Sequence, residues 1–339
     1  MTTTDQLKEK YESYKAENPK VRIRDAATAL GVSEAELVAI GNDNIALKPE
    51  IQAILLAIPS LGHVMALTRN DHAVHERKGT YSKASFHGPQ MGLVVGEDID
   101  LRLFLSNWAH VFAVNENDRQ SIQFFDKWGT AVHKIYLTES SDLNAYQDLV
   151  NTYKDENASS FTIDKISPEE KPEKADSEID QATFQAEWLA LQDTHDFFGL
   201  LRKHGVTRTQ ALRLAPAGHA QKIAISKVED MLNLVSEGKL EIMVFIGNSN
   251  CLQIHTGKAD RIMRTGPWIN ILDPAFNMHL RDEALDSVWI VKKPTNLGLV
   301  HSVETYDAKG NLVAQFFGKR KPDVPERTDW RELIKTISE

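Results

Sequence analysis

The sequence predicts an α+β protein with an internal duplication: two repeats, each a large antiparallel β-sheet with flanking helices. Two observations support this prediction. Short segments of alternating apolar and polar residues, punctuated by glycine and asparagine, are typical of an antiparallel meander, and helical patterns flank them. The pattern of the first half then returns in the second half. We expect a ligand cleft between the two halves.

Length and composition suggest two domains of an ordinary globular protein. The chain has 339 residues, of which 42% are hydrophobic and 26% are charged. A segment rich in Lys, Glu, Asp, Ser and Pro lies near the middle. We therefore predict an N-terminal repeat over 1–155, a charged linker over 156–183 and a C-terminal repeat over 184–339.

Charge and cysteine content argue against several classes of protein. The net charge of −9 disfavours a general nucleic-acid binder, which needs a dense basic surface. No apolar run is long enough for a membrane-spanning helix. Cys251, the single cysteine, has no partner for an internal disulfide and fits a reducing compartment, so we expect a cytoplasmic protein.

Residues 5–40 carry a helical pattern. Ser33 and Glu36 have the spacing of a capping box, which predicts a helix over 34–40. Two helices joined by a tight turn also resemble a DNA-binding helix-turn-helix. The acidic second helix would repel phosphate, which disfavours that alternative.

The rest of the first half alternates like a β-meander and closes with a helix over 143–153. The predicted strands are 64–67, 79–86, 91–95, 101–104, 110–114, 121–126 and 131–137.

The second half repeats this order of helical and strand patterns. Gly31-Val32-Ser33 returns as Gly205-Val206-Thr207, and Asp126-Lys127-Trp128-Gly129 lines up with Asp307-Ala308-Lys309-Gly310. Order and spacing are preserved with small adjustments in length, which indicates an internal duplication.

The segment Asp193–Gly205 predicts a short helix over 194–204. Asp193 or Thr194 can accept hydrogen bonds from its first amides, and Gly205 is a suitable C-terminal cap. His195 then lies in the first turn, on the same face as Phe198. An imidazole beside an aromatic ring suits a flat, apolar, iron-centred ligand. The alternative is a partly buried histidine on an amphipathic helix.

Three motifs resemble the HemS/ChuS family of bacterial cytoplasmic haem-utilisation proteins, and the resemblance covers nearly the whole chain. They are Val74-His75-Glu76-Arg77-Lys78-Gly79, Glu97-Asp98-Ile99-Asp100-Leu101-Arg102 and Thr194-His195-Asp196-Phe197-Phe198. The resemblance implies a protein that binds haem b (iron protoporphyrin IX) received from an inner-membrane importer. Its members are described as haem chaperones or as haem-degrading enzymes, and degradation would need a reductant or redox partner.

The resemblance also implies site residues. His195 matches the axial iron ligand, Arg102 matches a distal arginine and is the candidate catalytic residue, and Phe104 and Phe198 match phenylalanines that flank the haem. Residues expected around the haem and its propionates are Arg208, Lys293, Gln315 and Arg320. Phe317 stands where the family pattern suggests a tyrosine, so a hydroxyl hydrogen bond should be absent there.

Several alternatives stay open from the sequence. Arg102 could instead form an ion pair with Glu97, Asp98 or Asp100, and His75 could be an alternative iron ligand or bind a second haem. The protein could degrade haem to release iron, or hold haem and pass it to another enzyme.

Overall fold

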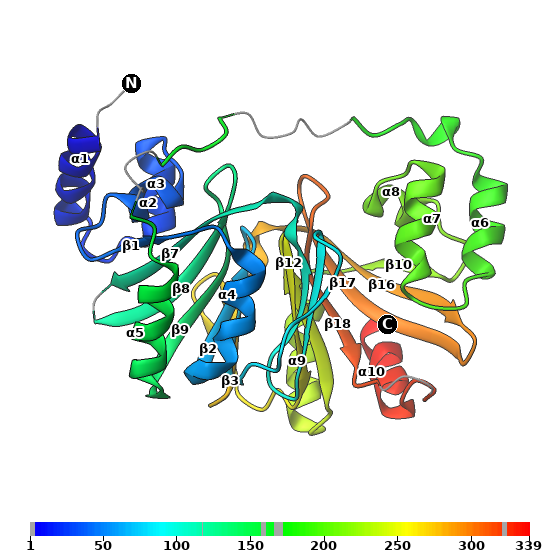
Figure 1. Cartoon of the computed structure of the whole chain (residues 1–339). Helices are drawn as coiled ribbons and strands as arrows, with labels where there is room; N and C mark the ends of the chain where they lie inside the picture. The colour runs from blue at the N-terminus through cyan, green and yellow to red at the C-terminus, as the bar shows by residue number, and fades with distance from the viewer. Residues whose placement is uncertain (1–3, 117, 157–160, 166–171, 321–323) are drawn as a thin grey trace. The chain divides into compact units, whose positions relative to one another are not determined.

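A computed structural model describes residues 4–116, 118–156, 161–165, 172–320 and 324–339 (Figure 1). No helix among these residues is long and apolar enough to cross a membrane.

The chain forms two compact units, and each includes a short segment from the sequence of the opposite half. Unit 1 comprises Met1–Thr68, Glu76–Pro168 and Asn248–Gln253. Unit 2 comprises Arg69–His75, Glu169–Gly247 and Ile254–Glu339.

The helices of unit 1 form two groups (Figure 1): α1 to α3 pack together, and α4 and α5 contact each other and the sheet. Their bounds are α1 Thr4–Glu17, α2 Ile23–Leu30, α3 Glu34–Ala39, α4 Ile51–Ala57 and α5 Leu143–Tyr153. The predicted capping box is confirmed, since Ser33 Oγ accepts from the Glu36 amide at 3.2 Å and Glu36 Oε2 accepts from the Ser33 amide at 2.7 Å.

The strands of unit 1 pair antiparallel in two series, β1-β7-β8-β9-β2 and β4-β5-β6. Their bounds are β1 Ile45–Leu47, β2 Gly62–Arg69, β4 Ser85–His87, β5 Met91–Val95, β6 Asp100–Phe104, β7 Trp108–Glu116, β8 Arg119–Asp126 and β9 Ala131–Ser141. The predicted strand over 79–86 is wrong, because β3 covers Ala73–Thr80 and the chain leaves the sheet before β4. At this break Tyr81 and Ala84 turn into the core.

Unit 2 repeats the arrangement, with antiparallel series β10-β16-β17-β18-β11 and β13-β14-β15. Its strands are β10 Ala220–Ile223, β11 Ile242–Gly247, β13 Ile262–Thr265, β14 Trp268–Leu272, β15 Phe276–Arg281, β16 Leu285–Thr295, β17 Gly298–Asp307 and β18 Leu312–Gly318. Strand β12 covers Cys251–Gly257 and belongs to unit 2 only from Ile254 onward. Its helices are α6 Gln181–Leu189, α7 Asp196–His204, α8 Arg208–Arg213, α9 Lys227–Glu237 and α10 Thr328–Ser338.

Matching turns support the duplication at atomic detail. Asp126 Oδ1 accepts from the amides two and four residues later, at 3.0 and 2.9 Å. Asp307 Oδ1 does the same at 2.9 and 2.8 Å. Each turn needs a left-handed residue, supplied by Gly129 with φ 79° and Gly310 with φ 78°.

A separate hydrophobic cluster holds α6, α7 and α8. In unit 2, α6 contacts α7 and β16, and α8 contacts β10 (Figure 1). Phe184, Trp188 and Phe197 are buried here, together with Tyr306 of β17. Trp188 and Phe197 meet edge to face, with ring centroids 4.8 Å apart. This cluster fixes the start of α7 on the sheet of unit 2.

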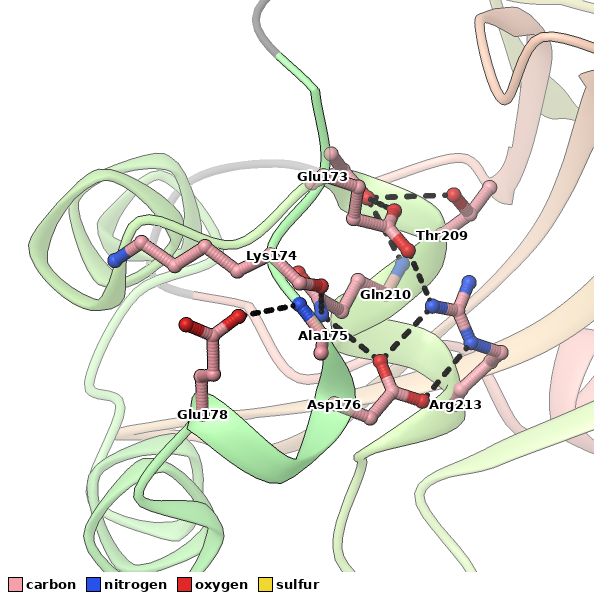
Figure 2. A network of polar contacts seen from close by, with 9 residues as sticks. Glu173, Lys174, Ala175, Asp176, Glu178, Thr209, Gln210 and Arg213 are labelled. Carbon is pink, nitrogen blue, oxygen red and sulfur yellow. Dashed lines mark hydrogen bonds and ion pairs between the residues drawn. The ribbon is translucent and has the colours of Figure 1, made fainter.

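Polar contacts attach residues 173–178, which lie within the predicted linker, to α8 (Figure 2). Arg213 pairs with Glu173 at 2.5 Å and with Asp176 at 3.0 Å. Gln210 Nε2 donates to the Lys174 carbonyl and to Asp176 Oδ1, both at 2.8 Å. This segment, which comes shortly before α6 in the chain, is therefore fixed to α8.

Candidate functional site

His195 is the residue immediately before α7. The helix begins at Asp196 and has His195 as its N-cap, two residues later than predicted. Its side chain is 90% exposed. Asp193 Oδ1 lies 2.5 Å from His195 Nδ1 and also accepts from the His195 amide at 2.8 Å. The alternative of a partly buried histidine is therefore wrong.

The Asp193 contact defines the tautomer of this imidazole. A carboxylate oxygen is an acceptor, so Nδ1 carries a proton, and in the neutral imidazole the lone pair is then on Nε2. Nε2 can then bind a metal, and the second ring nitrogen has the carboxylate partner typical of metal-ligating histidines. Within the described ranges there is no group of three or more His, Cys, Asp or Glu that could hold a metal ion.

The two phenylalanines that follow His195 point in opposite directions. Phe197 is buried in the α6–α8 cluster, whereas Phe198 is 65% exposed. Phe198 lies three residues after His195 and therefore on the same side of the helix start. The Arg202 guanidinium carbon is 5.9 Å from the Phe198 ring centroid. An exposed imidazole and an exposed aromatic ring thus lie on one surface.

A buried charge cluster lies beneath α7. Glu304 Oε1 accepts from Lys293 Nζ at 2.6 Å, and Glu304 Oε2 accepts from Arg208 Nε at 3.3 Å. The Tyr306 hydroxyl donates to Glu304 Oε2 at 2.5 Å. Burial alone would raise the pKa of Glu304, but the charges of Lys293 and Arg208 outweigh it and hold this pKa well below its usual range.

This cluster changes the interpretation of two predicted propionate ligands. The Lys293 ammonium is buried, and it lies 4.4 Å from the Phe197 ring centroid. Arg208 is partly exposed, and its guanidinium carbon lies 5.5 Å from the same ring. The Lys293 side chain is almost fully buried, so burial limits the access of a ligand to its remaining donors. Both cations lie against the Phe197 ring and so help to fix the start of α7.

Arg320 differs from these two cations, because no ion pair joins it to an acid among the residues that the structure describes. Its Nε atom is buried and has no hydrogen-bond acceptor among the residues that the structure describes. A backbone hydrogen bond from His195 is the largest cause that lowers the pKa of Asp193, and the charge of Arg320 lowers it further. Arg320 therefore lies within electrostatic reach of the Asp193–His195 pair.

Gln315 and Phe317 lie two residues apart on β18. Gln315 is buried and pairs with Glu304 across the β17–β18 ladder. The Phe317 ring centroid is 5.1 Å from that of Phe245. Phe317 has no hydroxyl, as the sequence already indicated.

Arg102 and Phe104 belong to unit 1, on β6. The ion-pair alternative for Arg102 is present, with Asp100 as its partner. Burial raises the pKa of Asp100 despite the opposing effect of Arg102. Asp98 pairs instead with Arg77, at 3.0 Å. Phe104, at the end of β6, is partly exposed.

His75 and Cys251, the other residues considered from the sequence, are both buried. His75 packs against Phe276 in unit 2, with ring centroids 4.9 Å apart, so it is not exposed to a ligand. Burial raises the pKa of Cys251 to about 12, which keeps it a protonated thiol.

Two parts of this site were not predicted from the sequence. Asp193 was considered only as a helix cap, although its position two residues before His195 was the available signal. Glu304 and Tyr306 gave no signal, because their contacts with Arg208 and Lys293 join distant positions in the sequence.

Fold and site together define a duplicated α+β protein that exposes an oriented imidazole beside an aromatic ring. The chain belongs to the family described as haemin-degrading HemS.ChuX domain, whose model matches residues 31–153 and 205–337.

Relatives and solved structures agree with this assignment. The chain is 38% identical over 335 residues to the hemin transport protein HmuS of Yersinia pestis, covering 97% of this chain and 96% of the relative. It matches apo-PhuS, a heme-binding protein from Pseudomonas aeruginosa, with TM-score 0.96, 44% identity and 99% of each chain covered. It also matches the heme degrading enzyme ChuS of Escherichia coli O157:H7, with TM-score 0.91, 33% identity and 99% of each chain covered.

Proposed function

We propose that this protein binds haem b, with Nε2 of His195 as the axial ligand of the iron. The observation that carries this proposal is the exposed His195 imidazole, whose Nδ1 is already bound to Asp193. Haem needs a neutral imidazole, an apolar face and cations for two carboxylates. The relatives named above are a hemin transport protein, a heme-binding protein and a heme degrading enzyme.

The surroundings of His195 meet the other needs of haem. The exposed Phe198 ring can pack against the porphyrin, where it would exclude water from the ligand. Arg320 is the best candidate for a propionate because its buried Nε has no hydrogen-bond partner among the described residues. Arg208 is the second candidate, since its side chain is partly exposed although Glu304 holds it. Lys293, Gln315 and Phe317 would support the site from within unit 2.

We further infer that the protein receives haem from an inner-membrane importer and acts in the cytoplasm. Degradation with iron release is the activity we propose, with Arg102 as the catalytic residue and an external reductant or redox partner. A haem chaperone is the alternative, and the Arg102–Asp100 pair favours it, because a guanidinium bound to a carboxylate has fewer free donors for a ligand.

Haem titration followed by optical absorption tests the ligand assignment. The wild type should show saturable one-to-one binding with a histidine-type Soret band. His195→Ala should weaken binding and shift the band. His219→Ala is the matched control, because His219 is another solvent-accessible histidine of unit 2. An unchanged spectrum and affinity in His195→Ala would contradict the assignment.

A turnover experiment separates the enzyme from the chaperone. Haem-loaded protein is given a reductant in air, with catalase present to remove free peroxide. Loss of the Soret band with iron release, abolished in Arg102→Ala, supports degradation. A persistent reduced or oxygen-bound spectrum supports the chaperone.

A further inference from the structure

Asp193 binds the imidazole that we assign to haem iron. Its Oδ1 accepts from both His195 Nδ1, at 2.5 Å, and the His195 backbone amide, at 2.8 Å. We propose that Asp193 is a positioning residue of the haem site, which fixes the tautomer and ring orientation of His195 and strengthens Nε2 as an iron ligand. This inference rests on the proposed haem binding through His195.

The carboxylate is itself held in place. Asp196 Oδ2 accepts from the Asp193 amide at 3.1 Å, and the Asp196 amide donates to the Asp193 carbonyl at 3.1 Å. Residues 193–196 therefore form a closed turn. The next residue, Phe197, is buried against Trp188, which attaches the turn to the core of unit 2. The direction of the His195 ring thus follows from the fold.

Stability does not explain the pair. The His195 side chain is 90% exposed and the Asp193 side chain 59% exposed, and ion pairs so exposed contribute little to folding. A free imidazole with this exposure would rotate between rotamers. Asp193 instead holds it in one orientation, with Nε2 directed away from the carboxylate. A flat ligand that covers the imidazole would exclude water and strengthen the hydrogen bond.

The hydrogen bond from His195 Nδ1 to Asp193 also changes His195 as an iron ligand. A carboxylate that accepts Nδ1–H increases the electron density on Nε2, and such partners raise ligand basicity. The expected effects are tighter binding of ferric haem, a lower reduction potential and a stiffer iron–imidazole bond. Loss of a comparable outer partner typically weakens metal affinity about 10- to 100-fold.

Two substitutions separate orientation from charge. Asp193→Asn keeps an oxygen acceptor but removes the charge, and Asp193→Ala removes both. We expect Asp193→Ala to weaken haem binding about 10- to 100-fold. It should also raise the reduction potential and lower the iron–imidazole stretching frequency of the ferrous protein in resonance Raman spectra. Asp193→Asn should lie between Asp193→Ala and the wild type. Asp286→Asn, at an exposed acid of unit 2, is the control for net charge.

A measurement without haem tests the same idea. Nitrogen-15 NMR of the imidazole should show His195 protonated on Nδ1 in the wild type and in Asp193→Asn. Asp193→Ala should give a tautomer mixture with the same melting temperature as the wild type.

The outcomes distinguish the two claims. If both Asp193 variants keep the wild-type tautomer, stretching frequency and potential, the positioning role is wrong while haem binding by His195 stands. If His195→Ala keeps the wild-type spectrum, the ligand assignment fails, and the positioning role fails with it.

Discussion

His195 and His133 have opposite surroundings, and these give the same side chain two different roles. His195 projects into solvent and is bound on one side only. His133, on β9 in unit 1, is buried between the Thr68 hydroxyl, 2.7 Å from Nδ1, and the Tyr81 hydroxyl, 2.6 Å from Nε2. Both nitrogens of His133 are occupied by neutral groups. The exposed Nε2 of His195 is accessible to a ligand, whereas both nitrogens of His133 are enclosed in the core.

The pH dependence of stability should report on His133. Burial lowers its pKa to about 3, against about 6.5 in an unfolded chain. The folded protein keeps the ring neutral while the unfolded chain gains a proton below that value. The contribution of the neutral His133 ring to the free energy of unfolding is therefore fully present above pH 6.5 and is lost as pH falls toward 3. The loss amounts to roughly 3–5 kcal/mol.

His133→Gln tests whether His133 causes this loss of stability at low pH, because glutamine keeps a donor and an acceptor but does not titrate. The free energy of unfolding, measured by hydrogen exchange of β8 and β9 peptides from pH 7 to pH 4, should fall less steeply in the variant. Parallel curves for the two proteins would refute the assignment of the proton to His133.

The residue scale also shows what the sequence could and could not predict about the site. The place of His195 at the start of a helix was predictable, because its neighbours carry helix caps and an aromatic residue at helical spacing. The partners of Lys293 and Arg208 were not. A cation expected at a ligand's carboxylates looks, in sequence, like one that pairs with a buried Glu304. Only the three-dimensional contacts separate the two.

At the scale of elements, α7 has an inner face and an outer face with different duties. Phe197 joins the buried cluster with Trp188, and Phe198 projects outward beside His195. The inner ring therefore contributes to folding, and we propose that the outer ring contacts the haem.

Two alanine substitutions should separate the role of Phe197 in folding from the proposed role of Phe198 in haem binding. Phe197→Ala should destabilise the protein by about 3–5 kcal/mol, as for other buried aromatic residues. Phe198→Ala should leave the melting temperature of the haem-free protein unchanged and weaken haem binding. Thermal unfolding and haem titration of both variants check this. Equal losses of stability would show that Phe198 also packs in the core.

Elements with regular patterns were predicted well, and elements with mixed patterns were not. The strand over 91–95 and the helix over 143–153 match β5 and α5. Strand β3 was missed because His75, Glu76, Arg77 and Lys78 interrupt the apolar alternation, although His75 points into the core. A buried histidine in a charged run reads as a loop in sequence.

At the scale of the whole molecule, the two units carry opposite charges at equivalent helix starts and pair them with different strands. In unit 1, Glu34 at the start of α3 pairs with Lys134 of β9 at 2.5 Å. In unit 2, the equivalent first residue of α8 is Arg208, and it pairs with Glu304. Repeated glycine motifs made the duplication visible in the sequence. The partners of Glu34 and Arg208, which lie on strands that are not counterparts, could not be predicted from the sequence.

Each unit contains a short segment from the opposite half of the sequence, and these exchanged segments could not be predicted from the sequence. Predicted boundaries are contiguous ranges, whereas unit 1 takes Asn248–Gln253 and unit 2 takes Arg69–His75. Within unit 1, the Asn250 carbonyl accepts from Trp108 Nε1 at 3.1 Å and from the Phe104 amide at 2.9 Å. Cys251 lies in the same core. A short segment therefore completes the packing of a unit that is mostly encoded elsewhere.

A fragment of residues 1–168 should consequently be much less stable than unit 1 in the full chain. It lacks the carbonyl that binds Trp108 Nε1, and each buried donor left without a partner costs about 1–3 kcal/mol. It also leaves a cavity where Cys251 packs. Joining residues 248–253 to the fragment through a glycine–serine linker should restore cooperative unfolding, and a scrambled segment of equal length should not. Thermal unfolding by circular dichroism measures the difference. If 1–168 alone unfolds as cooperatively, and at the same temperature, as unit 1 does in the full chain, the exchanged segment contributes nothing to stability.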